Sequence, residues 1–456
     1  TAVCVAEASD VKPDTKGSSM TKTSTECRAV RPLAGDYVTL YESPDPANFH
    51  GYSPGLAKCC DRIVATIDLS GPAWADHLEE PLWHRGELGW SWQGRVYTSD
   101  DHGTTWTQRA AYPFMHARPF VAGKSVYVLG QAKDLWIIRS DDGGTTWTEP
   151  ARLTEGQFWH QAPSNTWTAN GCLYLVMERR LTFDIHTWYV GEMAPVLMRG
   201  PLDADLTRRE NWTFASEKSF RDTLPHTETD PALQWHGIPF WECPYPLGSE
   251  PHPHRNCAPI GWLESNVVQF TDPDHLWTDP TGKTFHLWMR AHTGGTGYAA
   301  ILKVTEQGDI PGTGEMVTDL VTAPSGKTLL YLPCPGGQMK FHVLYDAPTR
   351  LFWLLSTQAT DSMTRPDRLP DGRYNLPNNE RRRLQLHFSK NMVDWCFAGL
   401  VCEGPSDNGA RHYASMVIDG DALHILSRSG DERAANAHNG NLITFHTIPH
   451  FRNLAY

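Results

Sequence analysis

The sequence contains no long hydrophobic segment. No apolar run among its 456 residues reaches the roughly 18 residues that a membrane-spanning helix needs, so we expect no membrane span. Positive charge is also scarce, with 40 Lys and Arg against 52 Asp and Glu and a formal net charge of −12. Because no basic patch is present, neither a nucleic acid nor an anionic membrane surface is expected as the partner.

Cysteine is sparse, and its spacing has no metal-site signature. The 10 cysteines are too few for a disulfide scaffold in a chain of this length, and no Cys-x-x-Cys pair occurs. We therefore expect no metal in the site and no cofactor, with a structural calcium ion as an open alternative. The chain begins with Thr, which is compatible with a removed signal peptide or with trimming. A secreted or periplasmic protein is the expectation.

Sustained helical periodicity is missing as well, whereas strand and turn signals recur. Apolar residues make up 40% of the sequence and aromatic residues 11%, which is enough for a large core and argues against disorder. Short turns rich in Asp, Asn, Gly or Pro precede runs of aromatic and β-branched residues. Such runs are found at 125–129, 172–177, 284–289, 351–356 and 423–427. Many hairpins without helices predict an all-β sandwich, barrel or propeller.

One short motif occurs twice. Residues 99–106 have the sequence SDDHGTTW and residues 140–147 have SDDGGTTW. This spacing is about the length of one four-stranded propeller blade. In both copies the Ser and Asp side chains are suited to bind turn amides, the Gly to adopt a left-handed backbone, and the Trp to pack between sheets. A degenerate copy at 389–395 keeps the Ser and the Trp.

The repeated motif resembles the Asp-box of the sialidase (neuraminidase) superfamily, and the resemblance extends from about Tyr52 to the C-terminus. It implies an all-β fold, a single six- or seven-bladed β-propeller with Asp-box turns, closed by pairing of the chain ends. We assign residues 1–35 to an N-terminal arm and 36–456 to the propeller, with a long insertion at about 215–262. Asp-boxes lie at the blade periphery and also occur in binding proteins, so the motif indicates the fold more than the chemistry.

The resemblance further implies an arginine cluster for a sugar carboxylate, a tyrosine nucleophile with a glutamate partner, and an aspartic acid–base. Tyr413 lies in a segment similar to the strand that carries the nucleophile. At the end of the following strand, however, Arg428 stands where the family has the glutamate, so the tyrosine lacks its proton acceptor. Glu178 is the candidate for a distant base. No aspartate is identified as the acid, because Asp68 follows Arg62 too closely.

Several arginines are candidates for binding the carboxylate. Arg62 begins a strand similar to the one that carries the family's first arginine. Arg383 ends a run of three arginines in front of a strand that resembles the site of the third, and Arg290 ends a strand before a Gly-rich loop. A surface position or a rim salt bridge is the alternative for each. The expected substrate-binding set is Arg62, Arg290, His292, Arg383, Arg411 and Arg428.

Histidines suggest a second chemistry. The sequence has 21, and several fall at strand or loop ends from which they could converge on the propeller axis. Histidine is suited to proton abstraction near neutral pH, which a lyase acting on a uronic acid requires. The position of His50 resembles that of the essential histidine in propeller enzymes that cleave rhamnose–glucuronate linkages. The candidate catalytic residues are Tyr413, His50, His116, His160 and Glu178.

Together these features predict a carbohydrate-active enzyme that cleaves, from the non-reducing end, a linkage at an acidic sugar. The Asp-boxes and the Tyr413 segment favour a sialidase-like hydrolase. Arg428 in place of the glutamate, the missing aspartic acid and the histidines favour a uronic-acid-directed lyase or glycosidase of the rhamnose–glucuronate type. A non-catalytic glycan-binding propeller is the third hypothesis. In each case the expected partner is an acidic oligosaccharide or polysaccharide.

Overall fold

The structure, a computed structural model, describes residues 30–74, 84–85, 91–185, 189–223, 261–292, 297–361 and 380–456; of residues 84, 85 and 292 it describes the backbone alone. The chain divides into two compact units, Thr1–Arg31 and Pro32–Tyr456, and the second contains all the elements named below. No helix among the described residues combines the length and the apolar character needed to span a membrane.

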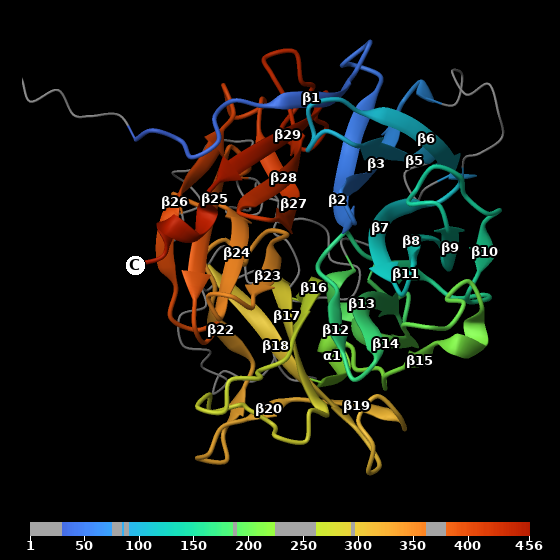
Figure 1. Ribbon diagram of the computed structural model, residues 1–456, viewed down its shortest axis with the longest axis vertical. Coiled ribbons are helices and arrows are strands. Elements are labelled where there is room, and N and C mark those ends of the chain that lie inside the picture. The colour runs from blue at the N-terminus through green and yellow to red at the C-terminus, as the bar shows by residue number, and fades with distance from the viewer. Residues whose placement is uncertain are drawn as a thin grey trace, which may run out of the picture. The chain divides into compact units, whose positions relative to one another are not determined.

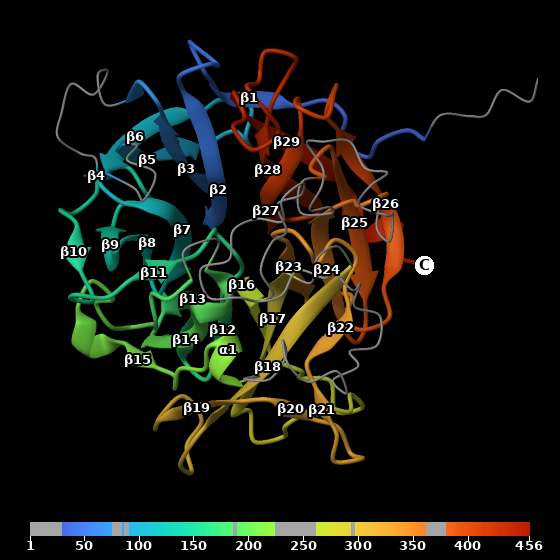
Figure 2. The same cartoon turned by 180° about the vertical axis from the view of Figure 1, so that it is seen from behind.

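Six sheets of four or five strands follow one another along the described part of the second unit, arranged as propeller blades around a common centre (Figures 1 and 2). Blade 1 contains β2 (His50–Cys59), β3 (Arg62–Gly71), β4 (His84–Arg85), β5 (Ser91–Ser99) and β6 (Thr107–Tyr112). Blade 2 contains β7 (Met115–Ala122), β8 (Ser125–Ala132), β9 (Asp134–Ser140) and β10 (Ala151–Arg152). Blade 3 contains β11 (Trp159–His160), β12 (Trp167–Ala169), β13 (Cys172–Arg180), β14 (Met193–Pro201) and β15 (Thr213–Phe214).

The other three blades complete the ring. Blade 4 contains β16 (Gly261–Val268), β17 (Thr284–His292), β18 (Tyr298–Glu306), β19 (Met316–Asp319) and β22 (Tyr331–Pro333). Blade 5 contains β23 (His342–Asp346), β24 (Leu351–Thr357), β25 (Arg383–Ser389) and β26 (Cys396–Glu403). Blade 6 contains β27 (Arg411–Asp419), β28 (Ala422–Ser429), β29 (Leu442–Pro449) and β1 (Val38–Glu42).

The remaining described elements are short. A separate hairpin joins β20 (Val321–Thr322) to β21 (Thr328–Leu329). The helical segments are α1 (Phe220–Thr223) and the 3-10 turns Val190–Glu192, Arg209–Asn211 and Phe451–Leu454. Most of the expected insertion at 215–262 lies outside the described residues, and its end falls inside β16.

The core is distributed between the blades. Six clusters of buried apolar residues each join two adjacent blades, so a central strand is buried on both faces. In β3, Ile63 and Ile67 pack toward blade 6, whereas Val64 between them packs toward blade 2. This alternation follows from the two-residue period of a strand. It explains why the strands appear in the sequence as almost continuous apolar runs.

The ends of the chain close the ring. β1 pairs antiparallel with β29, so blade 6 combines one strand from the beginning of the second unit with three from its end. Closure by pairing of the chain ends is thereby confirmed, and the blade number is six.

The repeated turns have the geometry expected from their sequence. In the first copy, the Ser99 hydroxyl donates to Asp101 at 2.8 Å and accepts from the Gly103 amide at 2.8 Å. Asp101 also accepts from the amide and hydroxyl of Thr105, and the Trp106 indole donates to the Gly103 carbonyl. The second copy repeats this hydrogen-bond pattern. The first turn joins β5 to β6 and the second joins β9 to β10, at the outer side of the propeller.

Candidate active site

Four of the innermost strands share one irregularity. In β2, β7, β16 and β27 the pairing register shifts by a β-bulge. Each bulge contains one residue with a left-handed backbone: Ser53 (φ 40°), His116 (φ 52°), Glu264 (φ 56°) and Tyr413 (φ 51°). Side chains with a Cβ rarely adopt such angles, and strained residues at bulges concentrate where a side chain must be redirected for function. The bulges therefore mark the centre of the ring as the candidate site.

Tyr413 is joined to two of the other blades. Nη1 of Arg290, on β17, donates to the Tyr413 hydroxyl at 2.7 Å and to Oε2 of Glu264 at 3.1 Å. Arg290 and Glu264 are buried, with 3% and 1% of their surfaces exposed, while Tyr413 is only partly buried. Burial raises the pKa of Tyr413, Arg290 lowers it and Glu264 raises it. A phenol, a carboxylate and a guanidinium thus form one hydrogen-bonded group.

Two further arginines lie against the ring of Tyr413. The guanidinium carbon of Arg428, on β28, is 5.1 Å from the ring centroid of Tyr413 and 4.3 Å from that of Tyr52. The corresponding atom of Arg381 is 5.5 Å from the Tyr413 ring, and its Nη1 lies 3.2 Å from Nδ1 of His412. Both arginines are buried, and no carboxylate of the described residues forms an ion pair with either.

These three arginines leave the centre short of negative charge. Glu264 compensates one of the three buried guanidinium groups, and burial lowers the pKa of Arg381 to about 9. An isolated charge taken out of water is costly unless a partner compensates it. The arrangement is therefore complementary to an anion, and a carboxylate is one of the groups that guanidinium pairs with in bidentate geometry.

A row of rings continues from Tyr52 across blades 1, 2 and 3. Centroid distances are 4.8 Å from Tyr52 to Trp92, 5.7 Å from Trp92 to His116 and 5.3 Å from His116 to His160. The Gln131 amide nitrogen lies 3.1 Å from His116 Nδ1 and 3.1 Å from a backbone carbonyl. Because an amide nitrogen donates, Nδ1 accepts and the imidazole proton is on Nε2. In this neutral form, Nε2 of His116 can donate a hydrogen bond.

Asp68 supports the His116 bulge. Its Oδ2 accepts from the backbone amide of His116 at 2.7 Å, and its side chain is fully buried in β3. Burial raises the pKa of Asp68 well above its ordinary value, which favours the neutral carboxyl. Asp68 thus supports the backbone of one of the central residues, and the prediction that no aspartate serves as the catalytic acid stays a prediction.

Glu178 lies behind the site and holds the strand that carries Glu264. Its Oε1 accepts from the amide and the hydroxyl of Ser265, at 3.0 and 2.6 Å, and from Gln161 Nε2 at 3.3 Å. Glu178 has no exposed surface. Glu264, and not Glu178, is the carboxylate beside Tyr413, which corrects the expectation that the tyrosine lacks a nearby acceptor.

The buried carboxyl of Glu178 predicts a pH-dependent stability. Burial raises its pKa from 4.5 to about 7, so between these values the folded state binds more protons than the unfolded state. The free energy of unfolding is therefore highest below pH 4.5. It falls by on the order of 3 kcal/mol as the pH rises toward 7. Glu178→Gln keeps an acceptor for Ser265 and cannot titrate. Urea unfolding at pH 5 and pH 7.5 should show a smaller decline for this variant; an equal decline in both proteins would contradict the assignment.

The structure separates several predicted residues from this centre. Arg62 begins β3 among the repeated turns, where it pairs with Asp100 at 2.6 Å, about six strand residues from Asp68. Arg383 pairs with Glu403 on β26, so the inward residue of the arginine run is Arg381. These two positions correct the expectation that Arg62 and Arg383 bind the substrate.

The other predicted positions lie at varying distance from Tyr413. Arg411 lies over the ring of Tyr37 and donates to backbone carbonyls. His50 is buried beside Tyr52, at a centroid distance of 6.2 Å, and burial together with Arg428 lowers its pKa to about 4. His160 is in the ring row described above. The side chain of His292 lies outside the described residues.

Sequence reasoning missed Glu264, Arg381 and Asp68. A signal was available for two of them, because Glu264 and Asp68 are the single carboxylates of two strand-like segments, 261–268 and 62–71. A carboxylate in a fully buried strand needs a partner, so its position alone suggests a site. The choice between Arg381 and Arg383 had no such signal, since residues two apart share one strand face.

Comparison with solved structures identifies the same architecture elsewhere. Trypanosoma rangeli sialidase in complex with sialic acid matches 93% of this chain at 13% identity, with a TM-score of 0.51. A mutant of this sialidase with trans-sialidase activity matches with a TM-score of 0.50 and 12% identity, again over 93% of this chain. This chain spans 60% of the length of each. The shared feature is the fold, a sialidase-like propeller.

Weaker matches include glycoside hydrolases of other origins. A Hadza microbial sialidase gives a TM-score of 0.47 at 15% identity, over 91% of this chain and 68% of its own. An α-L-arabinanase of Penicillium chrysogenum gives 0.44 at 11% identity, over 92% and 99%. No protein-family model matches the sequence, and no curated protein matches it significantly.

Proposed function

We propose that this protein is an exo-acting glycosidase that cleaves a linkage at a sugar carrying a carboxylate, by sialidase-like hydrolysis. The observation that carries the proposal is the convergence of three buried arginines on Tyr413, of which, among the described residues, only Arg290 has a carboxylate partner, Glu264. The fold shared with a sialidase that binds sialic acid supports the same substrate class.

The arginines would hold the substrate by its carboxylate. Arg381 and Arg428 offer guanidinium groups that have no carboxylate partner among the described residues. A bound carboxylate would compensate their charge and form paired, charge-assisted hydrogen bonds. This interaction would also fix the sugar so that its anomeric carbon faces the Tyr413 hydroxyl.

Tyr413 would act as the nucleophile. A neutral phenol approaches an anomeric carbon next to a carboxylate without charge repulsion, and Tyr-using sialidases are an exception to the two-carboxylate rule of glycosidases. As the Tyr413 oxygen bonds to the anomeric carbon, its proton passes to Glu264, and the bond to the leaving oxygen breaks. Arg290 contacts both groups and would hold them in this geometry.

His116 would supply the proton to the leaving oxygen. For this step the ring would start as the imidazolium, because a neutral imidazole is too weak an acid, and would give up its Nε2 proton; the neutral imidazole that remains can then act as a base. In the second step a water molecule, deprotonated by the same imidazole, would attack the anomeric carbon and release Tyr413. This assignment differs from the aspartic acid–base of the resembling family.

Elimination at a uronic acid is the second candidate, and the ring row favours it. His116 and His160 lie side by side, and burial lowers the pKa of His160 to about 4, so its imidazole is unprotonated at physiological pH. In that reaction the arginines neutralise the carboxylate while a histidine removes the C5 proton. Tyr52, Tyr413 or a second histidine would protonate the leaving oxygen.

One assay separates these functions. The protein is incubated with a sialyllactose and, separately, with a glycan ending in rhamnosyl-glucuronic acid, and both free sugar and absorbance near 235 nm are followed. Free sialic acid without absorbance is the expected result. A new absorbance identifies an unsaturated uronate and the lyase, whereas released rhamnose without absorbance identifies a uronic-acid-directed hydrolase. Binding without turnover of either glycan would overturn the enzymatic proposal in favour of a glycan-binding propeller.

A further inference from the structure

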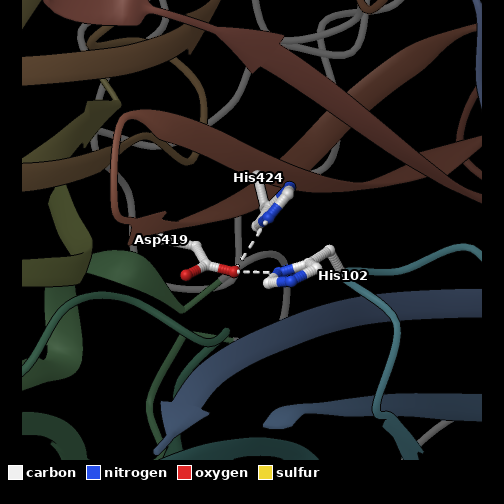
Figure 3. A group of neighbouring side chains, drawn as sticks. All are labelled: His102, Asp419 and His424. Atoms are coloured by element: carbon white, nitrogen blue, oxygen red, sulfur yellow. Dashed lines mark hydrogen bonds and ion pairs between the residues drawn. The ribbon is translucent and has the colours of Figure 1, made fainter. Parts of the chain in front are cut away.

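A group of two histidines and one aspartate lies at the opposite end of the strands from Tyr413. His102 belongs to the first repeated turn of blade 1, while Asp419 ends β27 and His424 lies in β28 of blade 6 (Figure 3). Their ligating atoms all lie within 4.8 Å of one another. β27 itself spans the distance to the candidate active site, since Tyr413 is near its beginning and Asp419 is its last residue.

His102 occupies a position that the repeat normally gives to a smaller residue. Its backbone is left-handed, with φ of 56°, and the equivalent residue of the second copy is Gly143, with φ of 72°. A histidine at such an angle is less favourable than a glycine, so the side chain needs a compensating role. It extends away from its own turn and places Nδ1 2.7 Å from Oδ2 of Asp419, on a different blade.

His424 presents a buried nitrogen to the same oxygen. Only 2% of its surface is exposed, and Nε2 has no hydrogen-bond partner, lying 3.4 Å from Asp419 Oδ2. Its Nδ1 lies 3.0 Å from the hydroxyl of Thr447, an outer contact of the kind that orients metal-binding histidines. Burial lowers the pKa of His424, which keeps its imidazole neutral, the form that binds a metal.

Asp419 is shared between this group and a lysine. Burial alone would raise its pKa, but hydrogen bonds from Lys58 and His102 lower it to about 2, so the carboxylate is ionised. Lys58 binds Oδ1, leaving Oδ2 to face both imidazoles. The ammonium group reduces the affinity for a cation, but it does not occupy the side on which the histidines lie.

From this geometry we propose that His102, Asp419 and His424 bind a divalent transition metal ion, with Zn²⁺ as the best fit. Two imidazole nitrogens and one carboxylate oxygen form a frequent zinc ligand set, and water would complete a tetrahedral shell because His102 is 67% exposed. Calcium is disfavoured, since it prefers six to eight oxygen ligands. A tetrahedral shell with bonds of about 2.0 Å places its ligand atoms about 3.3 Å apart. His424 Nε2 and Asp419 Oδ2 already lie 3.4 Å apart, and the exposed His102, whose Nδ1 is 2.7 Å from Oδ2, can adjust its position.

The ion would link blade 6 to blade 1, the two blades that meet where the ring closes. Blade 6 is the blade closed by β1, and the three ligands join it to blade 1, its neighbour across the point of closure. A metal that binds the folded state alone stabilises it by mass action. The consequence is a thermal stability that depends on metal and is specific to this interface.

Binding of Zn²⁺ to metal-free protein, measured by calorimetry alongside thermal unfolding, tests this proposal. The principal variant is His102→Gly, because glycine already occupies this position in the second repeat and the turn will still form. We expect the protein to bind one Zn²⁺ that this variant binds at least about tenfold more weakly. The rise in melting temperature with Zn²⁺ should shrink in parallel. His424→Gln should have the same effect, and Lys58→Met should tighten binding.

A matched control is present in the same blade. His450 also has a left-handed backbone, is 70% exposed and pairs with a single aspartate, Asp421, without a second histidine. His450→Gly should leave Zn²⁺ binding unchanged. Equal Zn²⁺ affinity in wild type, His102→Gly and His424→Gln would overturn the proposal, as would the absence of any Zn²⁺ binding by the wild-type protein.

Discussion

Replacing Tyr413 with phenylalanine is expected to reduce turnover of an acidic glycan at least about a thousandfold, because the hydroxyl that would form the bond to the sugar is removed. The ring that Arg381 and Arg428 contact stays in place, so the binding of the carboxylate should change by less than about fivefold. Single-turnover rates and product affinity, measured on the same preparation, separate these two quantities.

The control for Tyr413→Phe is Tyr127→Phe. The Tyr127 hydroxyl lies 3.5 Å from the carbonyl of Ala204, between blades 2 and 3, so this variant removes one hydroxyl from a buried tyrosine outside the centre. It should retain wild-type turnover. The single variant Glu264→Gln should also lose turnover, since it removes the proton acceptor of Tyr413. Full activity of Tyr413→Phe would exclude a tyrosine nucleophile and leave the histidines as the catalytic groups.

The fold was predictable because the sequence signals that specify it are local and repeated. Two copies of one turn, hairpin signals and apolar runs all specify short antiparallel strands, and the copies are spaced by one blade. The blade number was not predictable, since it depends on the angle at which neighbouring blades pack. That angle is fixed by six inter-blade cores whose members are far apart in the sequence, such as Ile63 and Phe445.

The candidate site was predictable only in part, for a related reason. Tyr413, Arg290 and Arg428 were found from their strands, and the structure brings these three together. Glu264 was missed because it reaches Tyr413 from another blade, through a bulge that no sequence pattern announces. Arg62 was misplaced because a predicted strand shows which residues it contains, but not which of its two ends lies near the candidate site.

Replacement by methionine should destabilise the protein much more at Arg290 than at Arg428, since among the described residues Arg290 has a carboxylate partner and Arg428 has none. Arg290→Met leaves Glu264 buried without its 3.1 Å partner, which should cost about 3–5 kcal/mol of unfolding free energy. Arg428→Met removes a charge that Arg381 opposes, and Nε of Arg428 has no hydrogen-bond partner, so the loss is limited to the hydrogen bond that Nη2 donates to the His438 carbonyl. Its cost should be within about 1 kcal/mol.

Both variants should nevertheless lose affinity for an acidic sugar. A charge-assisted pair to a carboxylate contributes about 1.5–3 kcal/mol, so Arg428→Met should weaken binding about 10- to 100-fold while its stability stays near that of the wild type. Urea unfolding and calorimetry with an acidic and a neutral sugar of matched size test this separation. The neutral sugar should bind the wild type and Arg428→Met equally.

The separation of stability from binding distinguishes a site built for an anion from a charge network built for folding. If Arg428 were structural, its loss would destabilise the protein as much as the loss of Arg290 and would not discriminate between the two sugars. If Arg428 instead serves to bind the carboxylate of the substrate, the acidic sugar should stabilise the wild-type protein by mass action. It should stabilise Arg428→Met much less. A destabilisation of Arg428→Met equal to that of Arg290→Met, with unchanged affinity for the acidic sugar, would therefore remove the electrostatic basis of the proposed function.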